Sequence, residues 1–76
     1  MEIKFGDIVK WKRPMNGAEE RDVMIVEDIL NEHLIEVRHI SGKKVTSSNE
    51  RVDAVKVVGH STPTEPIADI LKRYNN

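Results

Sequence analysis

The stretch "DIVKW", Asp7–Trp11, decides the fold predicted for this chain, because polar and apolar residues alternate along it. Successive side chains of a β-strand point to opposite faces of a sheet, so this period of two predicts a strand with one wetter face. The two faces carry Asp7, Val9 and Trp11 on one side and Ile8, Lys10 and Lys12 on the other. Gly6-Asp7 supplies a turn-type lead-in to the strand.

Two further segments are rich in β-branched and other apolar residues. Asp22–Leu30 ("DVMIVEDIL") and His33–Ile40 ("HLIEVRHI") are joined by two polar residues, which predicts a β-hairpin. Glu27-Asp28 interrupts the apolar run of the first segment, so we expect a bulge or bend there. In the second segment, we expect the face that carries Ile35 and Val37 to be buried.

The chain after the hairpin predicts two more short strands. The first is expected at Val45-Thr46. In the following stretch, "SSNERVDAVKVV", Ser47 and Glu50 have the spacing of a capping box, which predicts one helical turn before a final strand. Val55 and Val57 should point inward on that strand. The predicted core comprises Phe5, Val9, Met24, Val26, Ile35, Val37, Val55 and Val57.

The C-terminal stretch "TEPIADILKRY" has the pattern of an amphipathic helix. Thr64 is the expected N-cap, and Lys72 and Arg73 near the end complement the helix dipole. Apolar residues spaced i, i+3, i+4 and i+7 form one stripe, which consists of Ile67, Ile70, Leu71 and Tyr74. A helix of about ten residues is marginal alone, so the stripe must dock. Its own sheet, a second copy and a different protein are the three alternatives.

This order of elements resembles the Src-homology-3-like small barrel, in the "GDIVKW" opening and in the turn and strand of "SSNERVDAVKVV". Within that fold, "FGDIVKWKRP" followed by "VMIVEDI" is similar to small uncharacterised bacterial proteins and, more distantly, to KOW-type modules. The resemblance implies a mostly-β, five-stranded SH3-like barrel over residues 1–60, followed by a linker and helix over 61–76. Its loop carries only Gly17 where a KOW motif has more glycines.

Composition limits the functions that the chain can have. Seventy-six residues with no cysteine make one domain without disulfides or thiolate chemistry. No apolar run approaches the roughly 20 residues needed to cross a bilayer, and no segment resembles a signal peptide. We therefore expect a cytoplasmic protein with no membrane partner.

The sequence offers no set of residues suited to catalysis or metal binding. His33 and His39 lie about 20 Å apart on an extended strand at about 3.3 Å per residue, too far to share a metal ion. The serines lack the context of a nucleophile elbow, and no glycine-rich phosphate loop is present. We expect a protein that is not an enzyme and has no catalytic residue, cofactor or metal.

A binding surface is the remaining type of site. Trp11 beside basic residues either caps the core with a solvated basic flank or stacks on a base while the cations meet phosphates. The leading hypothesis is a bacterial protein–protein interaction module that uses the loop after the first strand and an exposed sheet edge. A nucleic-acid-binding module and an oligomer formed through the helix stripe are the alternatives. The candidate binding surface comprises Lys10, Trp11, Lys12, Arg13, Met15 and Arg38.

Overall fold

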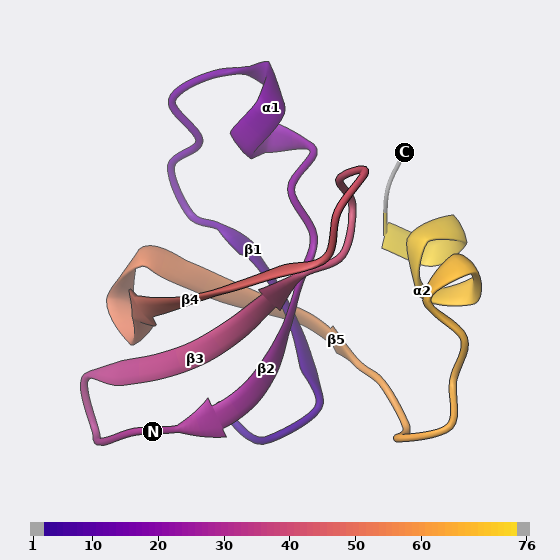
Figure 1. Cartoon of the computed structure of the whole chain (residues 1–76). Coiled ribbons are helices and arrows are strands. Elements are labelled where there is room, and N and C mark those ends of the chain that lie inside the picture. Colours follow the sequence, from indigo (N-terminus) through magenta and orange to yellow (C-terminus); the bar gives the residue numbers. More distant parts are fainter. Residues whose placement is uncertain (1–2, 75–76) are drawn as a thin grey trace.

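The protein is a single antiparallel β-sheet with a short helix at its C-terminal end (Figure 1). The computed structural model describes residues 3–74. The strands are β1 (Asp7–Trp11), β2 (Met24–Ile29), β3 (Leu34–His39), β4 (Thr46–Arg51) and β5 (Val55–His60). The helices are α1 (Gly17–Glu20), the 3₁₀ turn η1 (Val52–Ala54) and α2 (Ile67–Tyr74). The mostly-β architecture predicted from the sequence is confirmed.

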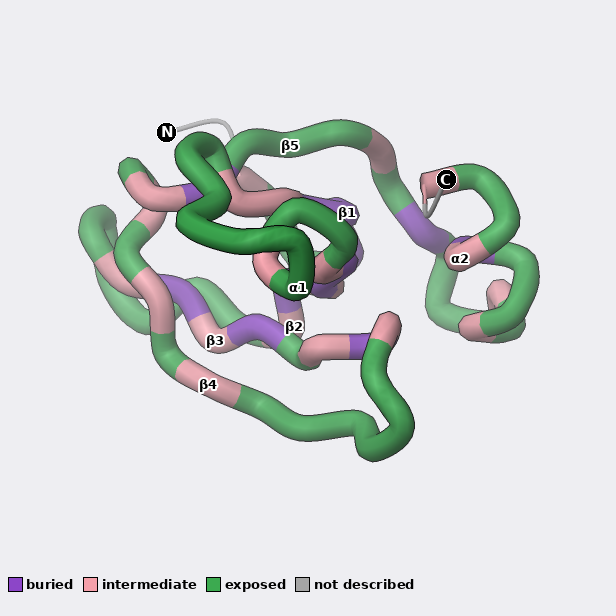
Figure 2. The backbone as a smooth tube through the Cα atoms, turned by 90° about the horizontal axis from the view of Figure 1, so that it is seen from above, coloured by how far each residue is buried: buried purple, intermediate pink, exposed green. Residues whose placement is uncertain are grey.

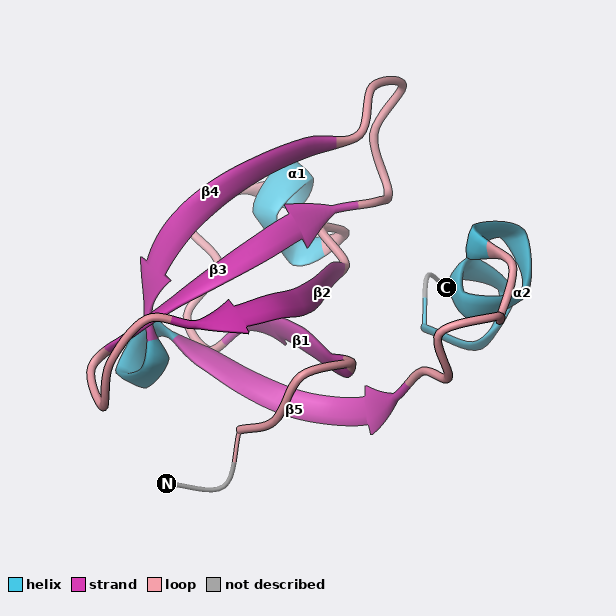
Figure 3. Ribbon diagram, turned by 60° about the horizontal axis from the view of Figure 1, so that its bottom comes forward, coloured by secondary structure: helices cyan, strands magenta, loops and turns pink. Residues whose placement is uncertain are grey.

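The strands follow the order β4-β3-β2-β1-β5, and every neighbouring pair is antiparallel. No ladder joins β4 to β5 among residues 3–74, so this part of the chain forms an open sheet rather than a closed barrel. The two strands lie on opposite sides of the curved sheet and meet at the end where η1 connects them (Figure 3). η1 is tied to the sheet through Ala54, whose carbonyl accepts from the Lys12 amide at 3.0 Å.

The inner face of the sheet holds the larger part of the predicted core. Figure 2 shows that the buried backbone is concentrated in β1, β2 and β3. The inner cluster consists of Val9, Met24, Val26, Ile35, Val37 and Val55, all at most 2% exposed. Ile3, Trp11 and Val52 pack against its margin. The expectation that Ile35 and Val37 face inward is confirmed.

Two predicted core residues, Phe5 and Val57, are exposed by 64% and 45%. Phe5 occupies the second position of a reverse turn that the Lys4 carbonyl and the Asp7 amide close at 3.1 Å. Gly6 takes a φ of 89° at the third position, which matches a type II turn and directs the preceding side chain outward. Val57 lies on an edge strand, so only one neighbouring strand covers it.

The β2–β3 hairpin forms as predicted. The Asn31 side chain accepts hydrogen bonds from the amides of His33 at 2.7 Å and Leu34 at 3.0 Å, which fixes the turn. The register shifts between Val26 and Asp28, so the expected bulge is confirmed. A bulge increases local twist, which here lets β2 curve with the sheet.

The helical turn predicted at Ser47–Glu50 is wrong. These residues belong to β4, which pairs with β3 from Leu34↔Arg51 to His39↔Thr46. The ladder supplies the backbone hydrogen bonds that a helical turn would otherwise provide, and the turn forms later, as η1. Tertiary pairing therefore overrides the local capping signal.

The loop after β1 contains a short helix that the sequence analysis missed. Asn16 caps α1 by accepting from the Glu19 amide at 2.9 Å, and the Glu19 carboxylate accepts from the Met15 amide at 2.7 Å. This reciprocal pair is a variant of the capping box, so Asn16-x-x-Glu19 was the available signal.

Helix α2 packs on the outer face of the same sheet. Ile70, 1% exposed, joins Ile8, Val23 and Ile40 in a second apolar cluster. The predicted N-cap at Thr64 is wrong. Residues 63–64 form a turn, and the helix begins later, at Ile67. At the other end, the Tyr74 hydroxyl lies against Gly59, where a Cβ atom would be only 1.9 Å away. The glycine therefore permits the helix to approach β5 closely.

Candidate functional site

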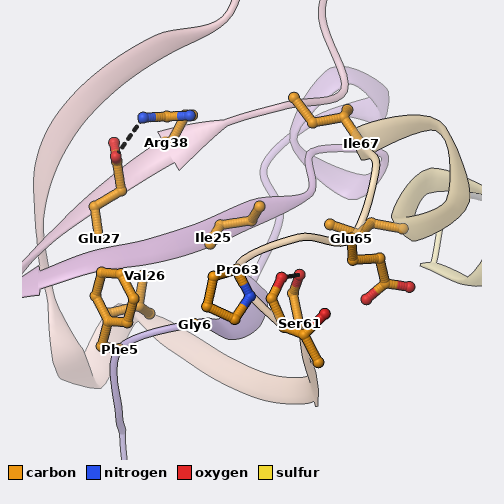
Figure 4. Close-up of a pocket in the computed structure, with 12 residues that line it drawn as sticks. Phe5, Gly6, Ile25, Val26, Glu27, Arg38, Ser61, Pro63, Glu65 and Ile67 are labelled. Carbon is orange, nitrogen blue, oxygen red and sulfur yellow. Dashed lines mark hydrogen bonds and ion pairs between the residues drawn. The ribbon is translucent and has the colours of Figure 1, made fainter.

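An apolar groove lies between the outer face of β2 and the segment that leads into α2. It is a cavity of about 240 Å³. Figure 4 shows side chains from four parts of the chain around it: the turn before β1, strands β2 and β3, residues 61–65, and α2. Its lining consists of Phe5, Gly6, Ile25, Val26, Glu27, Arg38, Ser61, Thr62, Pro63, Glu65, Ile67 and Ile70. We call it the Phe5 groove.

The backbone around Gly6 holds two walls of the Phe5 groove together. The Gly6 amide donates to the Val26 carbonyl at 2.9 Å, which fixes the turn of Phe5 beside β2. The Gly6 carbonyl accepts from the Ser61 amide at 2.8 Å, which fixes the start of the segment toward α2. A Cβ on Gly6 would lie 3.0 Å from both the His60 ring and the Ser61 carbonyl. Glycine is therefore required here for its backbone conformation and for space.

The Asp7 side chain stabilises the turn that carries Phe5 and Gly6. Its carboxylate is almost buried and accepts from the Lys4 amide at 2.9 Å. The other carboxylate oxygen lies 3.0 Å from Nδ1 of His60. The polar groups of Asp7 thus close the turn and anchor the end of β5, so the position of Phe5 is set by several bonds.

Two ion pairs form the polar rim of the Phe5 groove. Arg38 on β3 contacts Glu27 on β2 at 2.6 Å (Figure 4). Ser47 donates to the same carboxylate at 3.2 Å. On the α2 side, Arg73 donates two hydrogen bonds to Glu65. The hydrogen bonds from Arg73, together with its charge, hold the pKa of Glu65 below its ordinary value, although partial desolvation acts in the opposite direction.

Trp11 lies away from this groove and caps the inner cluster. Its ring is half-buried, and its indole Nε1 donates to Asp22 at 2.9 Å. The same carboxylate lies 3.0 Å from Nδ1 of His39 and accepts from the Ser41 hydroxyl at 3.3 Å. This set of contacts corresponds to the interpretation of Trp11 as a core cap.

His39 also contacts Ser48, with 2.7 Å between Nε2 and the hydroxyl oxygen, so Ser48, His39 and Asp22 form a hydrogen-bonded row. The row resembles a catalytic triad in composition only. The Ser48 hydroxyl donates its proton to Glu50 at 2.8 Å rather than to His39. A nucleophilic serine needs the opposite direction, with its proton passing to the histidine. The contacts connect β3 and β4 to the start of β2.

The other predicted binding residues occupy two different places. Lys10 points to the outer face, opposite Trp11, as the alternation of β1 requires, and Lys12 lies exposed just after the strand. Arg13 and Met15 lie exposed in the loop that carries α1, and Met15 is 83% exposed. Of the six candidate surface residues, Arg38 lines the Phe5 groove. Lys10 and Trp11 are adjacent on β1 and point to opposite faces of the sheet, so no single face presents both side chains.

The predicted docking stripe of the helix packs within the chain. Ile70 is buried, and Ile67, Leu71 and Tyr74 are half-buried against the outer cluster. Sequence reasoning missed the Phe5 groove because Phe5 was assigned to the core. The available signal was Phe5-Gly6, in which glycine at the third position of a turn leaves the preceding aromatic residue outside.

Among residues 3–74, no group of three potential metal ligands converges, and no helix is long and apolar enough to cross a membrane. No protein-family model, curated protein or solved structure matches the chain.

Proposed function

We propose that the protein is a non-enzymatic protein-binding module, of SH3-like small-barrel type, that holds an apolar peptide segment in the Phe5 groove. The proposal assigns it to the bacterial cytoplasm, with the bacterial source implied by the resemblance and the compartment by the composition and the lack of a signal-peptide pattern. The single observation that carries the proposal is a 64% exposed phenylalanine at the wall of an apolar cavity. Exposed aromatic side chains beside a pocket are typical of the residues that contribute most to protein interfaces.

The chemistry of the groove favours a peptide over a small polar substrate. Its floor is made by Ile25 and Ile70, which offer no hydrogen-bonding side chains. Polar groups lie only at the rim, where Arg38 is already paired with Glu27. Interfaces with an apolar centre and a polar rim have this arrangement. The expected ligand is a short segment that inserts one or two apolar side chains and contacts the rim with its backbone.

A phage-displayed library of random peptides, selected on the immobilised protein, tests the proposal. Peptides that bind should shift the amide resonances of Gly6, Ile25 and Ser61. Phe5→Ala should lower the affinity for a selected peptide by more than about tenfold. Truncation of a central aromatic anchor costs about 2 kcal/mol of binding free energy.

Met15→Ala is the matched control, since Met15 is an exposed apolar residue outside the groove. It should leave the affinity unchanged. Selected peptides that lose affinity equally with both variants, or that shift resonances only elsewhere, would rule out the Phe5 groove as the binding site.

A further inference from the structure

Three lysines lie on β1, on β5 and just after β1, and none of them lines the Phe5 groove. Lys10 and Lys56 are directly paired across the two strands, so their side chains leave the same face side by side. Lys12 lies just after the end of β1, two residues from Lys10 in the sequence. We call this set the lysine face. Lys12 and Lys56 are exposed, and Lys10 is half-buried beside the end of α2.

The lysine face is not neutralised within the part of the chain that the structure describes. Across residues 3–74, no carboxylate lies within 4 Å of these three amines. The Lys10 amine contacts the Tyr74 carbonyl at 3.5 Å. Asp53 is close enough to Lys12 to interact with its charge, but both oxygens of Asp53 accept from Arg51. The arginines on β3, β4 and α2, in contrast, are all paired with carboxylates.

Placing two lysines directly opposite each other is unfavourable for folding. Like charges at paired positions of antiparallel strands destabilise a sheet by a few tenths of a kcal/mol or more. The chain as a whole carries a net charge of −1, so the cluster is not a consequence of a generally basic composition. An anionic ligand that contacts both amines would convert this repulsion into attraction.

We propose that the lysine face binds the phosphate backbone of nucleic acid without sequence specificity. Lysine acts as a point charge toward phosphate, and the face carries no arginine or amide side chain arranged to read base edges. Trp11 points to the opposite side of the sheet, so base stacking on its ring is not part of this mode. Anionic membranes are the weaker match, because membrane-binding clusters have about four to eight basic residues.

Fluorescence anisotropy with a fluorescein-labelled single-stranded DNA of 20 nucleotides tests this inference. Binding should be detectable at 20 mM salt and should weaken about 30-fold between 20 and 100 mM. That change corresponds to a slope of about −2 in a plot of log affinity against log salt, as expected for about three phosphate contacts.

The decisive comparison uses two double variants with the same change of charge. Lys10→Gln/Lys56→Gln removes the facing pair, and Lys43→Gln/Lys44→Gln removes two exposed lysines from the β3–β4 turn. The first should lose about tenfold in affinity and reduce the slope by about 1.4, because two of the contacts are gone. It should unfold at the same or a higher denaturant concentration, since the repulsion is also removed.

Three results would overturn the proposal: equal losses in both double variants, no binding at 20 mM salt, or binding to phosphatidylserine vesicles but not to DNA. The assay does not depend on the peptide groove. Phe5→Ala should bind DNA like the original protein, so the two proposals succeed or fail separately.

Discussion

At the scale of single residues, Asp22 organises the largest number of side-chain contacts. Its carboxylate joins the indole of Trp11, the ring of His39 and the hydroxyl of Ser41, which come from β1, β3 and the turn after β3. Ser41 in turn accepts from the Val23 amide at 3.1 Å. Asp22 directly precedes buried Val23 and Met24, so one side chain fixes three elements at the margin of the core.

Asp22→Ala should destabilise the protein by about 1–3 kcal/mol, because it leaves the half-buried donor of Trp11 without its partner. Urea unfolding, followed by the fluorescence of the single tryptophan, measures this effect, and the emission of the folded variant should shift to longer wavelength. Glu20→Ala, on the exposed surface of α1, should change stability by less than about 0.5 kcal/mol. Equal effects of the two variants would contradict the role of Asp22.

At the scale of elements, α2 depends on contacts at both of its ends. Near its start, Glu65 is bonded to Arg73 of the last turn, and near its end, Tyr74 packs against Gly59. Ile70 supplies the buried contact between them. An eight-residue helix is too short to be stable alone, so these contacts with the sheet and the linker maintain it.

Lowering the pH should weaken the attachment of α2. Because the pKa of Glu65 is held below its ordinary value of 4.5, the Glu65–Arg73 pair stabilises the folded state above that value. The contribution is lost as the pH falls through the lowered pKa. Hydrogen exchange of the α2 amides from pH 6 to pH 3 measures the change, after correction for intrinsic exchange.

Glu65→Gln provides the comparison, because it keeps the shape of the side chain and removes its titration. In that variant, protection of α2 should be lower at pH 6 and should depend less on pH. Identical pH profiles for the two proteins would show that the pair does not hold the helix.

The elements differ in how far the sequence predicts them. The alternation in Asp7–Trp11, the apolar run of β2 and the stripe of α2 are strong periodic signals, and the structure contains all three elements. The capping-box pattern of Ser47–Glu50 gave a wrong prediction because it reflects local sequence only. The structure of β4 depends on its ladder with β3, which is distant in the sequence. The Phe5 groove was not predictable from periodicity, because its walls come from segments about 20 to 55 residues apart in the sequence. The turn at Gly6 brings these segments together.

At the scale of the whole molecule, the apolar stripe of α2 is used inside the chain. The remaining exposed apolar side chains include Met15 in the α1 loop, Leu30 in the β2–β3 turn and Val45 before β4. Ile29 lies beside Leu30 and Val57 beside Val58 in the sequence, each 36–45% exposed. Stable dimers need a larger contiguous apolar patch than such pairs provide. The outer face is therefore completed by the chain's own helix.

We expect the protein to sediment as a monomer at micromolar concentrations. Ile70→Ala should lower stability by about 2–5 kcal/mol and loosen α2. Any self-association should then appear in this variant and not in the original protein. A dimer of the original protein in sedimentation equilibrium would favour the alternative in which the stripe joins two copies.

The segment of residues 61–66 contributes a wall of the groove and connects β5 to α2. A peptide held against that wall would therefore also hold the tail in place. Linkage is reciprocal. Detachment of α2 must therefore lower the affinity for the peptide by the same factor by which the bound peptide favours the attached helix. Protection of α2 from proteolysis would thus report that a peptide occupies the Phe5 groove.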